Sequence, residues 1–290
     1  METKEIIRNV KKIEISTKTL VDSLITGNYN SVFKGQGIDF SEIREYKEGD
    51  DIRAIDWKVT ARFNKPFIKE FIEDRDLRIY FAIDISGSGS FGDIISKKRR
   101  QIEIAASLMF AAQKNNDNIG VFLFSDDIEI FIPARKGKKH LLSVLSKIIS
   151  YEPESLKTNI NDSLIKISKI IKKRSVIFII SDFYGENFRK PLKKLKERHD
   201  IVAIKVNENK ELSIPDVGLI ELEDEETGEQ ILVDTSDEEF RKNYMNIIRT
   251  HEKKLEDSFK KTKVDCIELH DDNYASNLRK FFKKRKMRQR

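Results

Sequence analysis

Five side chains that offer oxygen atoms stand where the chain leaves an apolar run or enters a helix-like stretch: Asp84, Ser86, Ser88, Thr158 and Asp182. The first three follow the apolar run 77–83, and the last directly follows the apolar run 176–181. Because ligands of an open α/β sheet bind at the carboxyl ends of its parallel strands, we expect the two aspartates to meet at one edge. Oxygen ligands select a hard cation, and Mg2+ takes about six of them at roughly 2.1 Å. The five residues therefore predict a Mg2+ site, with Mn2+ or Ca2+ as alternative ions.

The charge of this ligand set predicts what else binds there. Three of the five groups are neutral hydroxyls, so a bound metal would be only partly neutralised and would attract a carboxylate from another molecule. Simpler explanations exist for each piece: residues 86–89 could form only a turn, Thr158 or Asn159 could be only a helix N-cap, and Asp182 could be a cap. All of these explanations would have to apply at once, at both strand ends. We therefore favour a metal site that binds an acidic partner.

The elements that must position these residues alternate along the chain from residue 77. We expect strands at 77–83, 119–124, 128–132, 176–181, 201–206 and 264–269, and helices at 96–114, 138–149, 160–172, 187–198, 236–261 and from 274 onward. This order predicts an α/β fold with a mainly parallel sheet and helices on both faces. A hairpin is expected within 219–233, and Ser236 to Glu239 has the form of a capping box.

The first 75 residues differ from the rest. Residues 5–24 have the periodicity of an amphipathic helix. A dense segment follows, REYKEGDDIRAIDWKVTAR at positions 44–62, which we name the signature segment. We expect an N-terminal part over residues 1–75 and a main domain over 76–290.

Two resemblances rest on these residues. Asp84, Ser86, Ser88, Thr158 and Asp182, in this order, resemble the metal-ion-dependent adhesion site of von Willebrand factor A domains. The signature segment resembles that of the domain-of-unknown-function fifty-eight family, whose members couple it to a von Willebrand A-like domain. The resemblance covers the chain from about Val32 to its end, and it implies a von Willebrand A-like, doubly wound sheet. We expect the N-terminal helix and an irregular or β extension to precede this sheet.

The family resemblance also implies a function. Its members are associated with MoxR-type AAA+ ATPases, which implies a non-enzymatic adaptor or chaperone factor that binds the ATPase or an acidic residue of a client protein. The chain itself lacks a Gly-x-x-x-x-Gly-Lys-Ser/Thr phosphate loop. The alternative is a Mg2+-dependent phosphohydrolase using Asp84, but such an enzyme needs a second acid two residues later, where this chain has Ser86. The Gly-x-Ser-x-Gly elbow of serine hydrolases is absent, and the four histidines are expected at the surface.

The signature segment carries charges of both signs at close spacing. We expect six of them to form a fixed ion-pair network that clamps the N-terminal part on the sheet: Arg44, Asp50, Asp51, Arg53, Asp56 and Arg62. Trp57 would anchor this clamp. A docking surface for another protein is the alternative.

Composition sets further expectations. The chain has 290 residues, a net charge of +6 and a pI of about 9.1, with its excess basic residues at 279–290. This tail is expected to be a solvated helix end, with weak polyanion contact as the alternative and no pattern for specific nucleic-acid recognition. No apolar run has the length of a membrane span, and no signal peptide is evident, so we expect a cytoplasmic protein. The single cysteine, Cys266, is expected to be a small core residue.

Overall fold

The computed structural model describes residues 3–26, 39–63, 65–72, 77–86, 94–185, 187–206, 214–223, 230–269 and 274–288. The chain divides into two compact units. The larger one comprises residues 1–32 together with 78–290, and the smaller one comprises residues 33–77. Within the described ranges, no helix combines the length and the apolar character needed to cross a bilayer.

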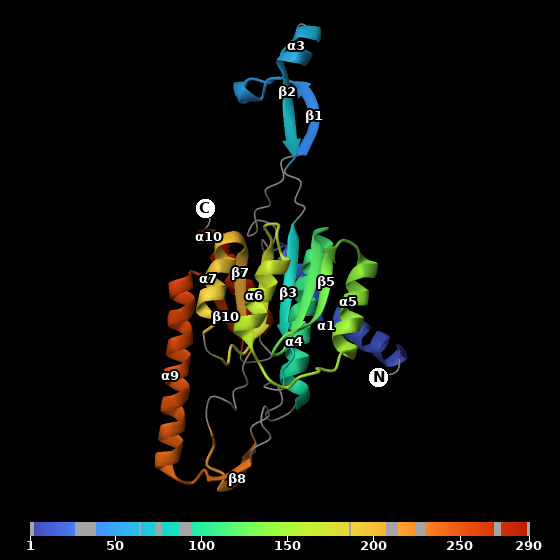
Figure 1. The fold of residues 1–290 in the computed structure, drawn as a ribbon. Coiled ribbons are helices and arrows are strands. Elements are labelled where there is room, and N and C mark those ends of the chain that lie inside the picture. Colours follow the sequence, from blue (N-terminus) through green and yellow to red (C-terminus); the bar gives the residue numbers. More distant parts are fainter. Residues whose placement is uncertain are drawn as a thin grey trace. The chain divides into compact units, whose positions relative to one another are not determined.

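The larger unit is built on a six-stranded sheet with the order β10-β7-β6-β3-β4-β5 (Figure 1). Its strands are β3 (Arg78–Asp84), β4 (Asn118–Phe124), β5 (Ile128–Arg135), β6 (Val176–Ser181), β7 (Asp200–Val206) and β10 (Asp265–Leu269). Neighbouring strands are parallel except for β5, which lies antiparallel to β4 at one edge. The inner strands are buried on both faces, as their near-continuous Ile, Val and Phe residues require. The predicted α/β fold with a mainly parallel sheet is confirmed.

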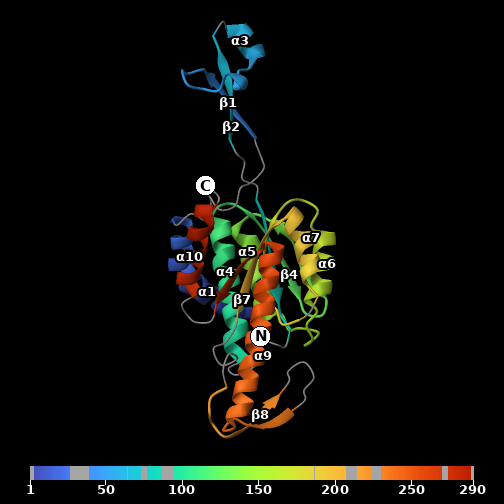
Figure 2. The same cartoon turned by 90° about the vertical axis from the view of Figure 1, so that its left-hand side faces the viewer.

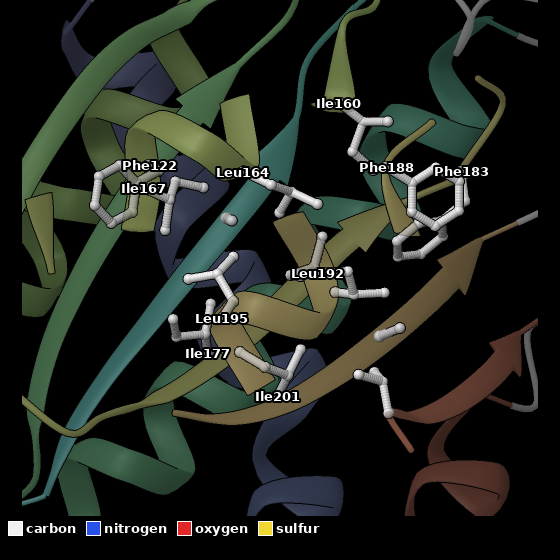
Figure 3. Close-up of a cluster of buried hydrophobic side chains, with 14 of the residues drawn as sticks. Phe122, Ile160, Leu164, Ile167, Ile177, Phe183, Phe188, Leu192, Leu195 and Ile201 are labelled. Atoms are coloured by element: carbon white, nitrogen blue, oxygen red, sulfur yellow. The ribbon is translucent and has the colours of Figure 1, made fainter. Parts of the chain in front are cut away.

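Helices cover both faces of this sheet (Figure 2). The helices α4 (Ile94–Lys114), α5 (Lys138–Ser150) and α10 (Tyr274–Arg288) cover one face, and α6 (Ile160–Ile170), α7 (Arg189–Arg198) and the end of α9 (Glu238–Thr262) cover the other. Alternation along each strand supplies both cores. In β6, Ile177 and Ile179 join the cluster under α6 and α7 (Figure 3). Phe178 points the other way, to Phe282 of α10, with their ring centroids 6.5 Å apart.

Helix α1 (Thr3–Thr26) belongs to the larger unit, whereas the sequence prediction grouped it with the signature segment. Its apolar face, with Val10, Leu20 and Val21, is buried. The helix packs against α4, α5 and α10. An amphipathic helix of this length needs a partner for its apolar face, and the helical layer of the sheet provides one.

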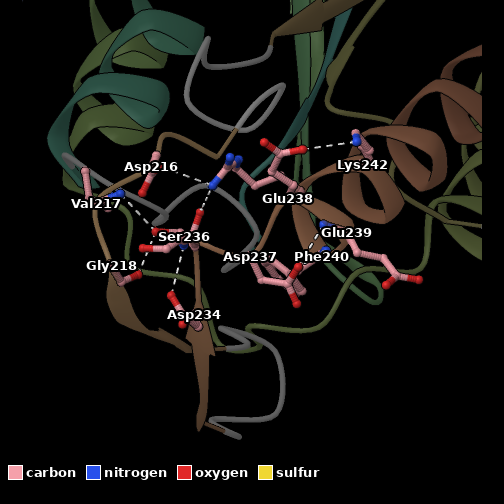
Figure 4. A network of polar contacts seen from close by, with 12 residues as sticks. Asp216, Val217, Gly218, Asp234, Ser236, Asp237, Glu238, Glu239, Phe240 and Lys242 are labelled. Atoms are coloured by element: carbon pink, nitrogen blue, oxygen red, sulfur yellow. Dashed lines mark hydrogen bonds and ion pairs between the residues drawn. The ribbon is translucent and has the colours of Figure 1, made fainter.

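The β8–β9 hairpin and the start of α9 are joined by local hydrogen bonds (Figure 4). Strands β8 (Leu219–Glu223) and β9 (Gln230–Asp234) pair antiparallel, in the region where the sequence predicts a hairpin. The hydroxyl of Thr235 donates to the carbonyl oxygen of Gly218 at 2.6 Å. The N-cap of α9 is Asp237, whose carboxylate accepts from the amide of Glu239 at 2.8 Å, so the predicted capping box starts one residue too early.

The basic C-terminal stretch is packed, so the expectation of a solvated helix end is wrong for α10. Phe282 is fully buried, and Arg285 is only 5 % exposed. The guanidinium of Arg285 forms ion pairs with Asp200 at the start of β7 and, at 3.4 Å, with Asp265 at the start of β10. This stretch of α10 therefore packs at the amino-terminal ends of β7 and β10.

One histidine also departs from its expected surface position. His199 is 4 % exposed, and neither of its ring nitrogens has a hydrogen-bond partner in the described part of the chain. Burial lowers the pKa of this imidazole, with further lowering by Arg198 and Arg174. His199 is therefore a neutral core residue that follows α7.

The smaller unit contains β1 (Asp39–Glu45), a short 3-10 helix η1 (Ile52–Ala54), α3 (Trp57–Phe63) and β2 (Phe67–Ile72), which pairs antiparallel with β1. Two of the acidic residues of the signature segment cap helices: Asp51 accepts from the amide of Arg53 at 2.9 Å, and Asp56 accepts from that of Lys58 at 2.9 Å. One bidentate ion pair of the expected network is present, between Arg44 and Asp50.

That ion pair joins Arg44 to Asp50. The guanidinium contacts both carboxylate oxygens, at 2.8 Å and 3.0 Å, and together with the amide of Lys47 it lowers the pKa of Asp50 to about 2. Trp57, the expected anchor, is 68 % exposed. Helix caps and one bidentate pair thus stabilise the local fold of this segment, and the Trp57 side chain stays largely exposed.

Candidate metal centre

The two aspartates of the predicted site lie at the carboxyl ends of adjacent central strands. Asp84 is the last residue of β3, and Ser181, the residue before Asp182, is the last of β6. Because Ile83 pairs with Ile180 in the parallel ladder, Ser181 comes to lie beside Asp84. The register of the two parallel strands therefore brings both aspartates to the same end of the sheet.

Asp84 is held by three hydrogen bonds from hydroxyl and amide groups. Its Oδ1 accepts from the amide and from the hydroxyl of Ser86, at 3.1 Å and 2.6 Å. Its Oδ2 accepts from the hydroxyl of Ser181 at 2.7 Å, and that hydroxyl accepts in turn from the amide of Phe183 at 2.9 Å. Ser181 thus positions Asp84, a role that the sequence prediction did not assign to it although it precedes Asp182 at the strand end.

The electrostatics of this pair favour a cation. Asp84 is only 4 % exposed. Burial, followed by the negative charge of Asp182, raises the pKa of Asp84 to about 6, while the hydrogen bonds from Ser86 and Ser181 act in the opposite direction. A buried carboxylate beside a second one is stabilised by any positive charge that reaches both.

Asp182 has a cationic partner within the chain. Its Oδ2 accepts from the ammonium of Lys97 at 3.1 Å, and its Oδ1 accepts from the amide of Tyr184 at 2.9 Å. Lys97 is 2 % exposed, and Asp182 is 11 % exposed. The sequence prediction missed Lys97, because its run of basic residues, 97–100, has the composition of a solvated helix face.

The Thr158 loop lies at the same end of the sheet. The amide of Asn159 donates to the carbonyl oxygen of Ser125 at 3.0 Å, and Ser125 follows Phe124, the residue of β4 that pairs with Asp84. The hydroxyl of Thr158 is buried and has no hydrogen-bond partner among the described residues. Asn159 is the N-cap of α6, so the simple capping explanation applies to Asn159 and leaves the Thr158 hydroxyl without a structural role.

The structure thus brings Asp84, Ser86, Thr158 and Asp182 to one end of the sheet, while Ser88 lies outside the described residues. No group of three or more His, Cys, Asp or Glu residues that could hold a metal occurs in the described ranges. The site is therefore a hydroxyl-rich one with two carboxylates. Two features suit a hard cation that prefers oxygen ligands. The buried hydroxyl of Thr158 has no partner among the described residues, and the charge of Asp84 is not fully balanced.

Comparisons with known sequences place the chain in a family. A family model described as "Protein of unknown function DUF58" matches residues 42–254. The uncharacterized protein Mb1516 of Mycobacterium bovis is 30% identical over 223 residues, which cover 76% of this chain and 70% of that protein. The uncharacterized protein YeaD of Bacillus subtilis is 28% identical over 105 residues, which cover 36% of this chain and 24% of YeaD.

Solved structures with a similar fold include BatB from Bacteroides thetaiotaomicron, with a TM-score of 0.47, 15% identity and coverage of 72% of this chain and 98% of BatB. A von Willebrand factor type A protein from Catenulispora acidiphila has a TM-score of 0.42, 10% identity and coverage of 76% and 44%. The sheet order and the helices on both faces define the fold of this chain as α/β with a mainly parallel six-stranded sheet. Since the family model matches well over half of its residues, the chain belongs to the DUF58 family.

Proposed function

We propose that the chain is a non-enzymatic, Mg2+-dependent protein-binding module that works with a MoxR-type AAA+ ATPase as an adaptor or chaperone factor. The observation that supports metal binding is the buried Asp84 beside the partly buried Asp182, at the end of the sheet where the Thr158 hydroxyl has no partner among the described residues. The ATPase is proposed from the family resemblance of the signature segment.

In this proposal Asp84, Ser86, Thr158 and Asp182, together with Ser88, hold the cation. The bound ion supplies a positive charge at the end of the sheet, to which a carboxylate of the ATPase or of a client protein binds. The chain's own residues prepare this site: Ser86 and Ser181 fix the orientation of the Asp84 carboxylate. The neutral hydroxyls leave part of the metal charge for the partner to balance.

The experiment combines metal titration with partner capture. Isothermal titration with millimolar Mg2+ should give binding to the wild type, loss of binding for Asp84→Ala, and unchanged binding for Asp257→Ala, a control carboxylate on α9. Capture of a purified MoxR-type ATPase should weaken by similar factors with EDTA, with Asp84→Ala and with Asp182→Ala, and the effects should be non-additive because all three act on one site. Equal Mg2+ affinity of wild type and Asp84→Ala would refute the metal site.

If Asp84→Ala still captures the ATPase in EDTA, the metal bridge to the ATPase is refuted, and docking through the signature segment becomes the better explanation.

The alternative function, a phosphohydrolase using Asp84, lacks its second acid: that position is Ser86, whose hydroxyl donates to Asp84. Turnover of p-nitrophenyl phosphate by the wild type, lost in Asp84→Asn at preserved fold, would establish the enzyme instead.

A further inference from the structure

Lys97 is a buried ammonium within the candidate metal centre. It lies near the start of α4, and it is among the largest side chains that are fully buried in the described part of the chain. Its neighbours Lys98, Arg99 and Arg100 stay partly or largely exposed, whereas Lys97 lies on the face of α4 that also buries Gln101 and Ile104. Burying an ammonium is costly unless an anion compensates it, and Asp182 is that anion.

The carboxylate oxygens of the site are already engaged by groups of the chain. Both oxygens of Asp84 accept from Ser86 or Ser181, and those of Asp182 accept from Tyr184 and Lys97. Three of these donors are neutral and can share an oxygen with a metal. Lys97 is different, because its positive charge repels a second cation at the same oxygen.

We infer that Lys97 is the internal counter-ion of this site and competes with a divalent cation for Asp182. This inference rests on the proposed Mg2+ site and adds how that site is regulated. In the metal-free protein the ammonium balances Asp182. Metal binding displaces the ammonium from Oδ2, so the chain's own cation lowers the metal affinity and restricts occupancy to conditions of high metal concentration.

The test is Mg2+ titration of the full chain by calorimetry, repeated with Mn2+, for wild type, Lys97→Met and Lys97→Gln. Lys98→Met, on the next position of α4 and without an ion pair among the described residues, is the matched control. Both Lys97 variants should bind the metal at least about ten times more tightly than wild type, and Lys98→Met should not change the affinity. Lys97→Gln keeps a hydrogen-bond donor for Asp182 without the charge, so it separates competition by charge from changes in packing.

The outcomes distinguish this inference from the proposed function. If the wild type binds Mg2+ and the Lys97 variants bind it equally well or more weakly, the inference is overturned and the metal site still holds. Binding by the variants alone would support the inference and overturn a metal-dependent function of the wild type. Binding by none of the three would overturn both. If Lys97→Met does not fold without metal, Lys97→Gln alone is compared with the wild type. Mg2+ should then raise the melting temperature of Lys97→Gln more than that of the wild type.

Discussion

Asp84→Asn is expected to stabilise the metal-free protein near neutral pH. The substitution removes the charge of a carboxylate that burial and Asp182 disfavour. It preserves the shape of the side chain, and the amide oxygen can still accept from the amide and hydroxyl of Ser86. The substitution should therefore remove a destabilising charge while the strand end stays intact.

The magnitude follows from the pKa of about 6 against the ordinary value of 3.8. This difference corresponds to roughly 3 kcal/mol between the protonated and the ionised site. Because the folded-state pKa is raised, this stability is fully present below pH 3.8 and is lost as the pH rises through 6. About 1.4 kcal/mol of it should disappear between about pH 5 and pH 7.5. The hydroxyl of Ser181 loses its acceptor in the variant, at about 1 kcal/mol, so the net gain near pH 7.5 is about 2 kcal/mol.

The assay is urea unfolding in EDTA at about pH 5 and pH 7.5 for both proteins. The free energy of unfolding of the wild type, measured against that of Asp84→Asn, should fall by about 1.4 kcal/mol between these two conditions. Adding Mg2+ at the higher pH should stabilise only the wild type. A difference between the two proteins that does not change with pH would refute the reasoning, because Asp84 would then be ionised at an ordinary pKa or fully balanced by a cation of the chain.

Three further substitutions test other parts of the structure. Thr158→Val should weaken Mg2+ binding in calorimetry and leave the melting temperature of the metal-free protein unchanged or higher, since the lost hydroxyl has no partner in the described part of the chain; lower stability with unchanged metal affinity would contradict this. Arg285→Met should lower the free energy of unfolding by roughly 2 kcal/mol in urea titration, because Asp200 and Asp265 lose their buried cation and keep only the more exposed Lys196 and Arg288. An unchanged value would mean that the end of α10 does not pack. His199→Leu should stabilise the protein, and more so at pH 5.5 than at pH 7.5, because the lowered folded-state pKa of His199 reduces the stability of the wild type as the pH falls. Thermal unfolding at both pH values measures the gain in stability. Equal gains at the two pH values would show that the imidazole titrates normally.

The order and type of the elements of the larger unit could be predicted from the sequence because their signals are local. Two-residue and 3.6-residue periodicities mark strands and helices within windows of about 5 to 20 residues. A parallel sheet then brings strand ends to one edge, which is why Asp84 and Asp182 could be paired without a structure. The Thr158 loop follows the same logic, since its place before α6 puts it at that edge.

Tertiary structure alone decided which groups surround those carboxylates. Ser181 and Asp84 are 97 positions apart, and Lys97 and Asp182 are 85 apart, so no local pattern relates them. The same holds for Arg285, which the composition of its basic run assigns to solvent. The sequence does not show which charged side chains are buried. An ion-pair partner on another element can compensate a buried charge for its lost hydration, and that partner is known only once the elements pack. The sequence by itself therefore determined the sheet and the edge where two carboxylates meet, and the packing of α4 against that edge decided that one of them has a lysine as its counter-ion.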